Sequence, residues 1–283
     1  MSLAGDSRVH DLIRRALDED IGTGDVTTLS LVPQGLQGKA AILSRGSYVV
    51  AGLDVAAAVF AKVDASLRCR CAVTDGAEVS PDAVLMTIEG PVRGILTAER
   101  TALNFLQRMT GIATRTRQFV ERVRPFGTKI LDTRKTTPTL RVLEKYAVEC
   151  GGGTNHRMGL YDWVLIKDNH RNLWKANGAA HLAEAVATAR KRFPGIPVEV
   201  EVECAEDLMA ALQAKPEWIM LDNMTPEAMR RCVDLCAGRC QLEASGGVTL
   251  DTVAAIAATG VHAISVGGLT HSAPSADLSL ELV

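Results

Sequence analysis

The chain has 283 residues, of which 47% are hydrophobic and 23% charged, and its formal net charge is −2. This size suits one large domain or two ordinary ones with a sizeable core. The balanced charge excludes a global basic field for nucleic acid or an anionic membrane, and the apolar runs fall short of the roughly twenty residues of a membrane span. Seven cysteines, an odd number, and the lack of an apolar leader predict free thiols and a cytoplasmic location.

The first part of the chain predicts an α+β arrangement without repeated strand–helix units. Apolar residues recur at helical spacing over residues 8–18, and alternation with period two over residues 67–73 indicates a half-buried strand. The remaining predicted elements are strands over residues 38–45 and 47–51 and a short helix over residues 53–62.

The architecture changes at Thr97. A long helix is predicted to begin there, with Leu103 and Leu106 on its apolar stripe and Arg100 off it. After residue 127, apolar runs alternate with helical segments, which is typical of parallel strands covered by outer helices. The strand-like runs are Ile130–Leu131, Trp163–Ile166, Val198–Val202, Trp218–Leu221, Gln241–Ala244 and Ala263–Val266, with a short seventh candidate near residues 151–155. Predicted helices cover residues 179–193 and begin at Thr225 and Thr249, and together these units predict a barrel-like sheet.

Polar side chains follow most of these strands. They are Asp132, Arg134 and Lys135, then Asn155, His156 and Arg157, then Lys167, Asp168 and Asn169, and later Glu201, Asp222, Asn223, Ser245, Gly246, Gly247, Gly267 and Gly268. In an α/β barrel the carboxyl ends of the strands converge on one face, where active sites lie. We therefore predict that these residues form one site, whereas an isolated Arg134-Lys135 pair before the Thr137-Pro138 helix start would be an ordinary surface feature.

The charges in this set indicate a multiply anionic substrate. Arg134, Lys135, Arg157 and Lys167, together with His156, are too many cations for one small monoanion. Arginine engages carboxylates and phosphates with a planar two-donor fork. The hydroxyl of Thr133 lies beside the first two cations and also suits a bound anion.

The glycine pairs and the acids add two further functions. Ser245-Gly246-Gly247 and Gly267-Gly268 allow backbone N–H groups to approach a phosphate, and they follow the last two strands, the usual phosphate site of a barrel. Glu201 and Asp222 have no obvious local partner. Glu199, Glu201 and Glu203 share one side of their strand, and inward carboxylates need a cationic group nearby, so at least one should meet such a group. Cysteines 232, 236 and 240 have helical spacing and no accompanying histidine, which favours a helix face over a metal site.

Several segments together resemble the quinolinate phosphoribosyltransferase family. They are Glu99–Asn104, Asp132–Pro138, Asn155–Arg157, Leu165–His170, Glu199–Val202, Leu221–Met224, Glu243–Gly247 and Leu269–Ser272. The resemblance runs from about residue 8 to the end of the sequence. Thr139 stands where the family more often has glycine, and residues 171–178 depart from the usual loop.

The resemblance implies an α/β protein with two domains. Residues 1–108 would form an N-terminal α/β sandwich joined by segment 270–283, and residues 109–269 an open, incomplete seven-stranded α/β barrel. It implies a homodimer with shared active sites, and leaves any larger assembly open. The implied reaction joins quinolinate and 5-phosphoribosyl-1-pyrophosphate with magnesium, giving nicotinate mononucleotide, pyrophosphate and carbon dioxide for NAD biosynthesis.

The resemblance also implies a role for each matching residue. Arg134, His156 and Arg157 would hold the quinolinate carboxylates, with Thr133 beside them and Arg100 arriving from the partner chain. Lys135 and Lys167 would bind anionic groups between quinolinate and pyrophosphate, and Glu201 and Asp222 would face the ribose. The residues implied to hold the 5-phosphate are Ser245, Gly246, Gly247, Gly267 and Gly268, with His271 nearby. No residue is implied as a direct metal ligand, because the magnesium would be bound mainly through the pyrophosphate of the substrate.

Three alternatives remain open on the sequence. A related phosphoribosyltransferase could act on nicotinate or another aromatic acid. A Schiff-base lyase could use Lys167, which ends a barrel strand. A non-catalytic metabolite-binding protein would need the cations but not Glu201 and Asp222.

Overall fold

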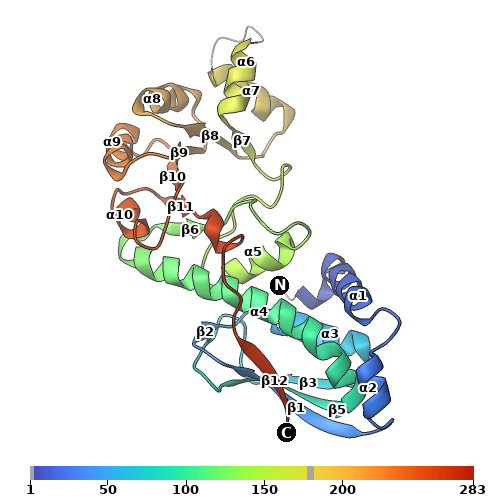
Figure 1. Cartoon of the computed structure of the whole chain (residues 1–283). Coiled ribbons are helices and arrows are strands. Elements are labelled where there is room, and N and C mark those ends of the chain that lie inside the picture. Colours follow the sequence, from blue (N-terminus) through green and yellow to red (C-terminus); the bar gives the residue numbers. More distant parts are fainter. Residues whose placement is uncertain (1–2, 177–181) are drawn as a thin grey trace. The chain divides into compact units, whose positions relative to one another are not determined.

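The structure is a computed structural model that describes residues 3–176 and 182–283 (Figure 1). Contacts divide the chain into two units. The first contains the residues up to Arg117 with Thr136–Gly152 and Gly268–Val283, and the second contains Gln118–Lys135 and Gly153–Gly267. The boundary expected between residues 108 and 109 falls inside helix α4 (Val92–Val123), and it stays a prediction.

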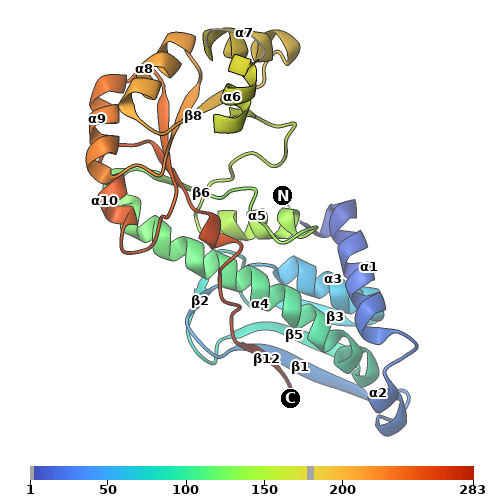
Figure 2. The same ribbon diagram turned by 45° about the horizontal axis from the view of Figure 1, so that its top comes forward.

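The first unit is built on an antiparallel sheet with the strand order β12-β1-β5-β3. Its strands are β1 (Gln37–Ser44), β3 (Arg68–Cys71), β5 (Val84–Pro91) and β12 (Leu278–Leu282), and a two-stranded sheet joins β2 (Tyr48–Val49) to β4 (Glu78–Val79). Its other elements are η1 (Leu3–Gly5), α1 (Ser7–Ile21), α2 (Val26–Leu31), α3 (Leu53–Val63) and α5 (Arg141–Cys150). Figure 2 shows α1, α3 and α4 on one side of the larger sheet. Ile42, Ile88 and Phe60 are completely buried in the core of this unit.

The second unit is built on a parallel sheet with the order β6-β11-β10-β9-β8-β7. Its strands are β6 (Lys129–Leu131), β7 (Val164–Ile166), β8 (Val198–Val202), β9 (Trp218–Asp222), β10 (Gln241–Ser245) and β11 (Ala263–Ser265). Its helices are η2 (Arg124–Phe126), α6 (Asp168–Ala176), α7 (Leu182–Arg192), α8 (Ala205–Ala214), α9 (Pro226–Cys236) and α10 (Val253–Ala257), and η3 (Gly267–Leu269) follows β11. Residues 179–181 of the helix predicted over 179–193, and residues 177–178 of the divergent segment 171–178, lie outside the described residues.

The predicted barrel is open, but it has six strands rather than seven in the described part of the chain. β6 and β7 are the two edges of the sheet and do not pair with each other. The expected seventh strand near residues 151–155 is only a single parallel bridge between Leu131 and Thr154. Gly152 has a φ of 87°, which is incompatible with an extended strand and limits the pairing to one residue.

Three helices begin at positions other than the predicted ones. α4 starts at Val92, before the expected Thr97. The start expected at Thr137 is delayed to Arg141, because Thr139 has a φ of 70° and its left-handed backbone interrupts the helix. This conformation explains why glycine suits position 139. The helix expected from Thr249 is the short α10, since hydrogen bonds between residues 249 and 252 form a turn before it.

A buried ion pair fixes the start of α5 in the first unit. Glu144 accepts hydrogen bonds from the Thr137 N–H at 3.0 Å, the Thr137 hydroxyl at 2.8 Å and Arg108 Nη2 at 2.8 Å. Arg108 also donates to the carbonyl oxygens of Thr270 and Ala273. The pair therefore connects three segments that are distant in the sequence.

We expect Arg108→Ala to lower the free energy of unfolding by about 3–5 kcal/mol, the range for removing one partner of a buried ion pair. The Glu144 side chain is 1% exposed and would lose its cationic partner. Arg117→Ala is the control, because its partner Glu78 is 69% exposed and such pairs contribute about 1 kcal/mol or less. Urea unfolding of both variants measures the difference, and equal losses would contradict the buried role.

None of the helices in the described part of the chain combines the length and apolar character that a membrane span requires.

Candidate active site

A pocket of about 540 Å³ lies in the second unit, where the parallel strands end. The predicted residues that line it are Asp132, Thr133, Arg134, Lys135, His156, Arg157, Lys167, Asp222, Asn223, Ser245, Gly246 and Gly247. It is also lined by Leu165, Met220, Glu243 and Ser265. The convergence expected at the carboxyl ends of the strands therefore brings most of the set together.

The remaining predicted residues have other positions. Glu201 does not line the pocket itself but forms an ion pair with the lining residue Lys167. Gly267 and Gly268 follow the lining residue Ser265 closely in the chain. Arg100 is exposed on α4 and His271 is exposed after η3, and both belong to the first unit. Their participation in the site stays a prediction.

Two arginines form a strongly cationic region of the pocket. Arg157 is 8% exposed, and its Nη1 donates to the Trp163 carbonyl oxygen at 3.2 Å. Burial, followed by the positive charge of Arg134, lowers the pKa of Arg157, with Glu199 acting in the opposite direction. Two neighbouring guanidinium groups repel each other, so an anion bound between them would stabilise both.

The inward side of β8 carries two of the three predicted carboxylates. Val198, Val200 and Val202 are completely buried on one face, while Glu199 is fully buried and Glu201 is 5% exposed on the other. Glu203 follows the strand and is exposed, contrary to the expectation that all three carboxylates point inward. The strand ends at Val202, and this places residue 203 in solvent.

The acids at the strand ends have local partners that the sequence did not reveal. Lys167 Nζ forms an ion pair with Glu201 Oε2. Asp222 Oδ2 accepts a hydrogen bond from Asn223 Nδ2 at 2.7 Å. The expectation that an inward carboxylate meets a cationic group is therefore met by Lys167.

The turn after β10 requires glycine. Gly246 has a φ of 98°, and a Cβ atom there would lie 2.1 Å from Asn223 Oδ1 and 2.9 Å from the Asn223 backbone nitrogen. Gly247 has a φ of 58°, and a Cβ there would meet no atom within 4 Å, so its side faces open space. A glycine turn of this kind leaves room for an anion to approach backbone N–H groups.

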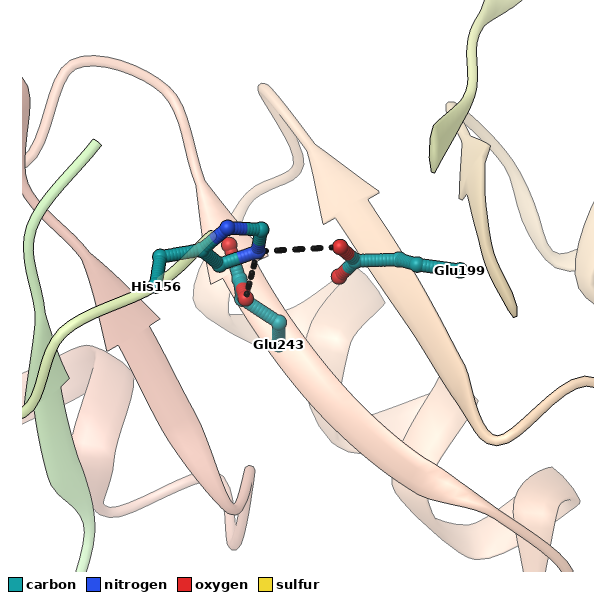
Figure 3. A group of neighbouring side chains, drawn as sticks. All are labelled: His156, Glu199 and Glu243. Atoms are coloured by element: carbon teal, nitrogen blue, oxygen red, sulfur yellow. Dashed lines mark hydrogen bonds and ion pairs between the residues drawn. The ribbon is translucent and has the colours of Figure 1, made fainter. Parts of the chain in front are cut away.

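Glu243 is the titratable lining residue of this pocket that was not predicted from the sequence. His156 Nε2 lies 3.0 Å from Glu199 Oε2 and 3.3 Å from Glu243 Oε2, and Figure 3 shows both carboxylates approaching the same ring nitrogen. Both glutamates are completely buried. The available signal was an acid inside the apolar run Leu242-Glu243-Ala244, the same pattern that had singled out Glu199 in β8.

Cys236 ends α9, and Cys240 follows it after a short turn. Cys236 Sγ lies 3.5 Å from Cys240 Sγ, and both residues are buried. Burial and the Cys236 thiol raise the pKa of Cys240 to about 12, so this thiol is neutral. The two side chains therefore pack against each other at the end of α9.

Comparisons with known proteins agree over almost the whole chain. The family described as "Quinolinate phosphoribosyl transferase, N-terminal domain" matches residues 25–110, and the corresponding C-terminal domain matches residues 112–281. "Nicotinate-nucleotide pyrophosphorylase [carboxylating]" of Mycobacterium leprae is 44% identical, over 96% of each chain. "Quinolinate phosphoribosyltransferase [decarboxylating] 1b" of Nicotiana tabacum is 41% identical, over 96% of this chain and 81% of the relative. The solved structure of the nicotinate-nucleotide pyrophosphorylase from Francisella tularensis has a TM-score of 0.91 and 39% identity, over 98% of this chain and 96% of that one.

Proposed function

This chain belongs to the quinolinate phosphoribosyl transferase family, and from that premise we propose that it converts quinolinate and 5-phosphoribosyl-1-pyrophosphate to nicotinate mononucleotide, pyrophosphate and carbon dioxide in NAD biosynthesis. The observation that carries this proposal is the pocket of the second unit, which combines a cationic cluster, a glycine turn and the acids Asp132, Asp222 and Glu243 in about 540 Å³.

Quinolinate would occupy the cationic side of the pocket. Arg134 and Arg157 would each engage a ring carboxylate, because two guanidinium groups match the charge of a diacid. His156 would contribute from the same side, with the Thr133 hydroxyl close to Arg134. These residues would orient the pyridine nitrogen toward the sugar.

The phosphoribosyl donor would lie across the remaining strand ends. Ser245, Gly246 and Gly247 would hold the 5-phosphate through backbone N–H groups, together with Gly267 and Gly268 and with His271 nearby. Lys135 and Lys167 would stabilise the pyrophosphate. Magnesium would arrive bound to that pyrophosphate as part of the substrate and would neutralise charge on the leaving group.

The acids would act on the sugar as the pyrophosphate leaves. Departure of the leaving group makes C1 of the ribose cationic, and Glu201 and Asp222 would stabilise this charge. The pyridine nitrogen then bonds to C1. Loss of the adjacent carboxylate as carbon dioxide leaves an electron pair on its ring carbon, which the positive nitrogen stabilises, and a proton from water then adds to that carbon. None of these reaction steps requires a nucleophilic side chain of the protein.

We expect Asp222→Asn and Glu201→Gln to reduce kcat much more than they raise KM. Each change removes a negative charge that acts when the sugar becomes cationic, so the loss appears in the transition state. Steady-state kinetics with both substrates separates the two constants. A pure KM effect with intact kcat would contradict the assigned role.

The proposed assembly is a homodimer whose sites take Arg100 from the partner chain, and the proposed location is the cytoplasm. The seven free cysteines of the chain agree with a reducing compartment. A Schiff-base lyase is less well supported, because such a lysine must be neutral and Lys167 is ion-paired with Glu201.

The proposed reaction is tested by incubating the protein with quinolinate, phosphoribosyl pyrophosphate and magnesium and measuring nicotinate mononucleotide. Parallel incubations with nicotinate and other aromatic acids decide the substrate, and borohydride trapping with carbonyl substrates tests the lyase. Among these acids, only quinolinate is expected to give a product.

A further inference from the structure

His156 and Glu243 line the pocket, and together with Glu199 they form a cluster of titratable side chains, with one ring-nitrogen or carboxylate oxygen atom of each within 4.8 Å of the others. Glu199 of β8 and Glu243 of β10 lie on strands that flank β9, where they pair with Trp218 and Met220. Both carboxylates face Nε2 of His156, whose side chain is 6% exposed (Figure 3). An imidazole and two carboxylates in this arrangement could hold either a metal ion or a proton.

The contact made by the other ring nitrogen of His156, Nδ1, favours a proton over a metal ion between Nε2 and the carboxylates. The backbone N–H of Arg157 donates to His156 Nδ1 at 2.7 Å, so Nδ1 acts as an acceptor and carries no hydrogen. A neutral imidazole in this state has its hydrogen on Nε2. That nitrogen then donates to the carboxylates and has no lone pair for a metal.

The cluster holds a second proton besides the one on Nε2. Burial, followed by the charge of Glu243, raises the pKa of Glu199 to about 7. Burial lowers the pKa of His156, but the carboxylates outweigh it and raise that pKa to about 9. An imidazolium between two carboxylates and a neutral imidazole beside a singly protonated pair have the same total charge. The contact between Arg157 N–H and Nδ1 places the second proton on the carboxyl pair.

Other groups around the cluster do not compete for this proton. Asp132, after β6, accepts the His156 backbone N–H at 2.8 Å. Arg157 interacts electrostatically with Glu199, and Glu201 on the same strand is paired with Lys167. The strand neighbours on β7 and β11 are the apolar Leu165 and Ala263.

We propose that Glu199 and Glu243 are positioning residues that share one proton, fix His156 as its Nε2–H tautomer and link binding of the diacid substrate to retention of that proton. This inference rests on the proposed function for the identity of the diacid. A dianion bound beside His156 adds negative charge near the pair, and the pair then holds its proton more tightly.

The sign of the pH effect follows from this linkage. Below the pKa of the pair in the free protein, both free and bound forms carry the proton and affinity is constant. Above that pKa, binding takes up a proton, so affinity falls by roughly tenfold per pH unit until the pKa of the bound form is reached. The decline begins between pH 7 and pH 9, the range bracketed by the raised pKa values of Glu199 and His156, because the proton belongs to the coupled cluster.

The tautomer can be observed without any substrate. Nitrogen-15 NMR of histidine-labelled protein, with His156 assigned by its loss in His156→Asn, is expected to show Nε2 protonated and Nδ1 unprotonated from pH 6 to 8. Addition of Zn²⁺ is expected to leave these signals unchanged. Protonation of both nitrogens at pH 7, or a zinc-dependent shift of Nε2, would overturn the inference.

The linkage is measured by titrating quinolinate into the parent protein, Glu243→Gln and Glu203→Gln between pH 6.5 and about 9.5, a range that includes both raised pKa values. Glutamine resembles the protonated acid, so Glu243→Gln should bind with little pH dependence. The exposed Glu203→Gln should follow the parent, in which the dissociation constant rises with pH. Glu199→Gln provides the second variant if circular dichroism shows Glu243→Gln unfolded.

Equal pH dependence in the parent and the folded glutamine variant would refute the shared proton. Absence of quinolinate binding at every pH would instead contradict the proposed substrate, while the NMR result would still decide where the protons lie.

Discussion

Arg100→Ala and Arg134→Ala are each expected to abolish nearly all activity as homodimers, and an equal mixture of the two to recover about a quarter of the parental activity. The reason is that each proposed site takes Arg134 from one chain and Arg100 from its partner. After subunit exchange about half of the dimers are hybrids, in which one site carries both changes and the other is intact. Activity measured before and after exchange tests the shared site.

Arg122→Ala provides the matched control for this experiment. Arg122 is another exposed arginine of α4, and its substitution should change activity little. A nearly silent Arg100→Ala would show that this residue is only a solvated helix arginine. Failure to recover activity, with exchange demonstrated by tagged subunits, would rule out a site formed by two chains.

Arg157→Ala is expected to weaken quinolinate binding by about 2–5 kcal/mol, the range for truncating one partner of a buried charge pair. The guanidinium is 8% exposed and lies near Arg134, so the pocket is arranged for an anion in a place with little water. This range corresponds to roughly 30-fold to several thousand-fold in the dissociation constant. Calorimetric titration of quinolinate measures it directly.

Arg157→Lys separates charge from geometry at the same position. Lysine keeps the charge but loses the two-donor fork, so we expect an affinity between those of the parent and Arg157→Ala. Equal turnover of nicotinate and quinolinate by the parent would contradict the assignment, because a monoacid leaves one of the two arginines without a carboxylate.

The sequence allowed the main features of the second unit to be predicted because period and position are local signals. Alternating strands and helices require parallel strands, and their polar ends must then meet at one edge. Arg134, Arg157 and Lys167 were found in this way. Gly246 was also found, because the Ser245-Gly246-Gly247 segment follows a predicted strand, and the structure shows that a side chain there would collide with Asn223.

Contacts between distant strands could not be predicted in the same way. The ion pair of Lys167 with Glu201 joins the end of β7 to β8. Glu243 lies close to His156 because β10 and the residues that follow Thr154 border the same pocket. The length of a strand was equally difficult to predict, since the conformation of Gly152 reduces the expected seventh strand to one bridge. Such features depend on register and backbone geometry, which a one-dimensional pattern does not contain.

The position of β12 has a consequence for the order in which the protein folds during synthesis. β12 pairs with β1 along Ala40–Ser44, although all residues of the second unit separate these strands in the chain. Until the ribosome has made those residues, β1 presents an unpaired edge to other nascent chains. The second unit contains its own sheet and can mature earlier, so the unit that begins first is completed last.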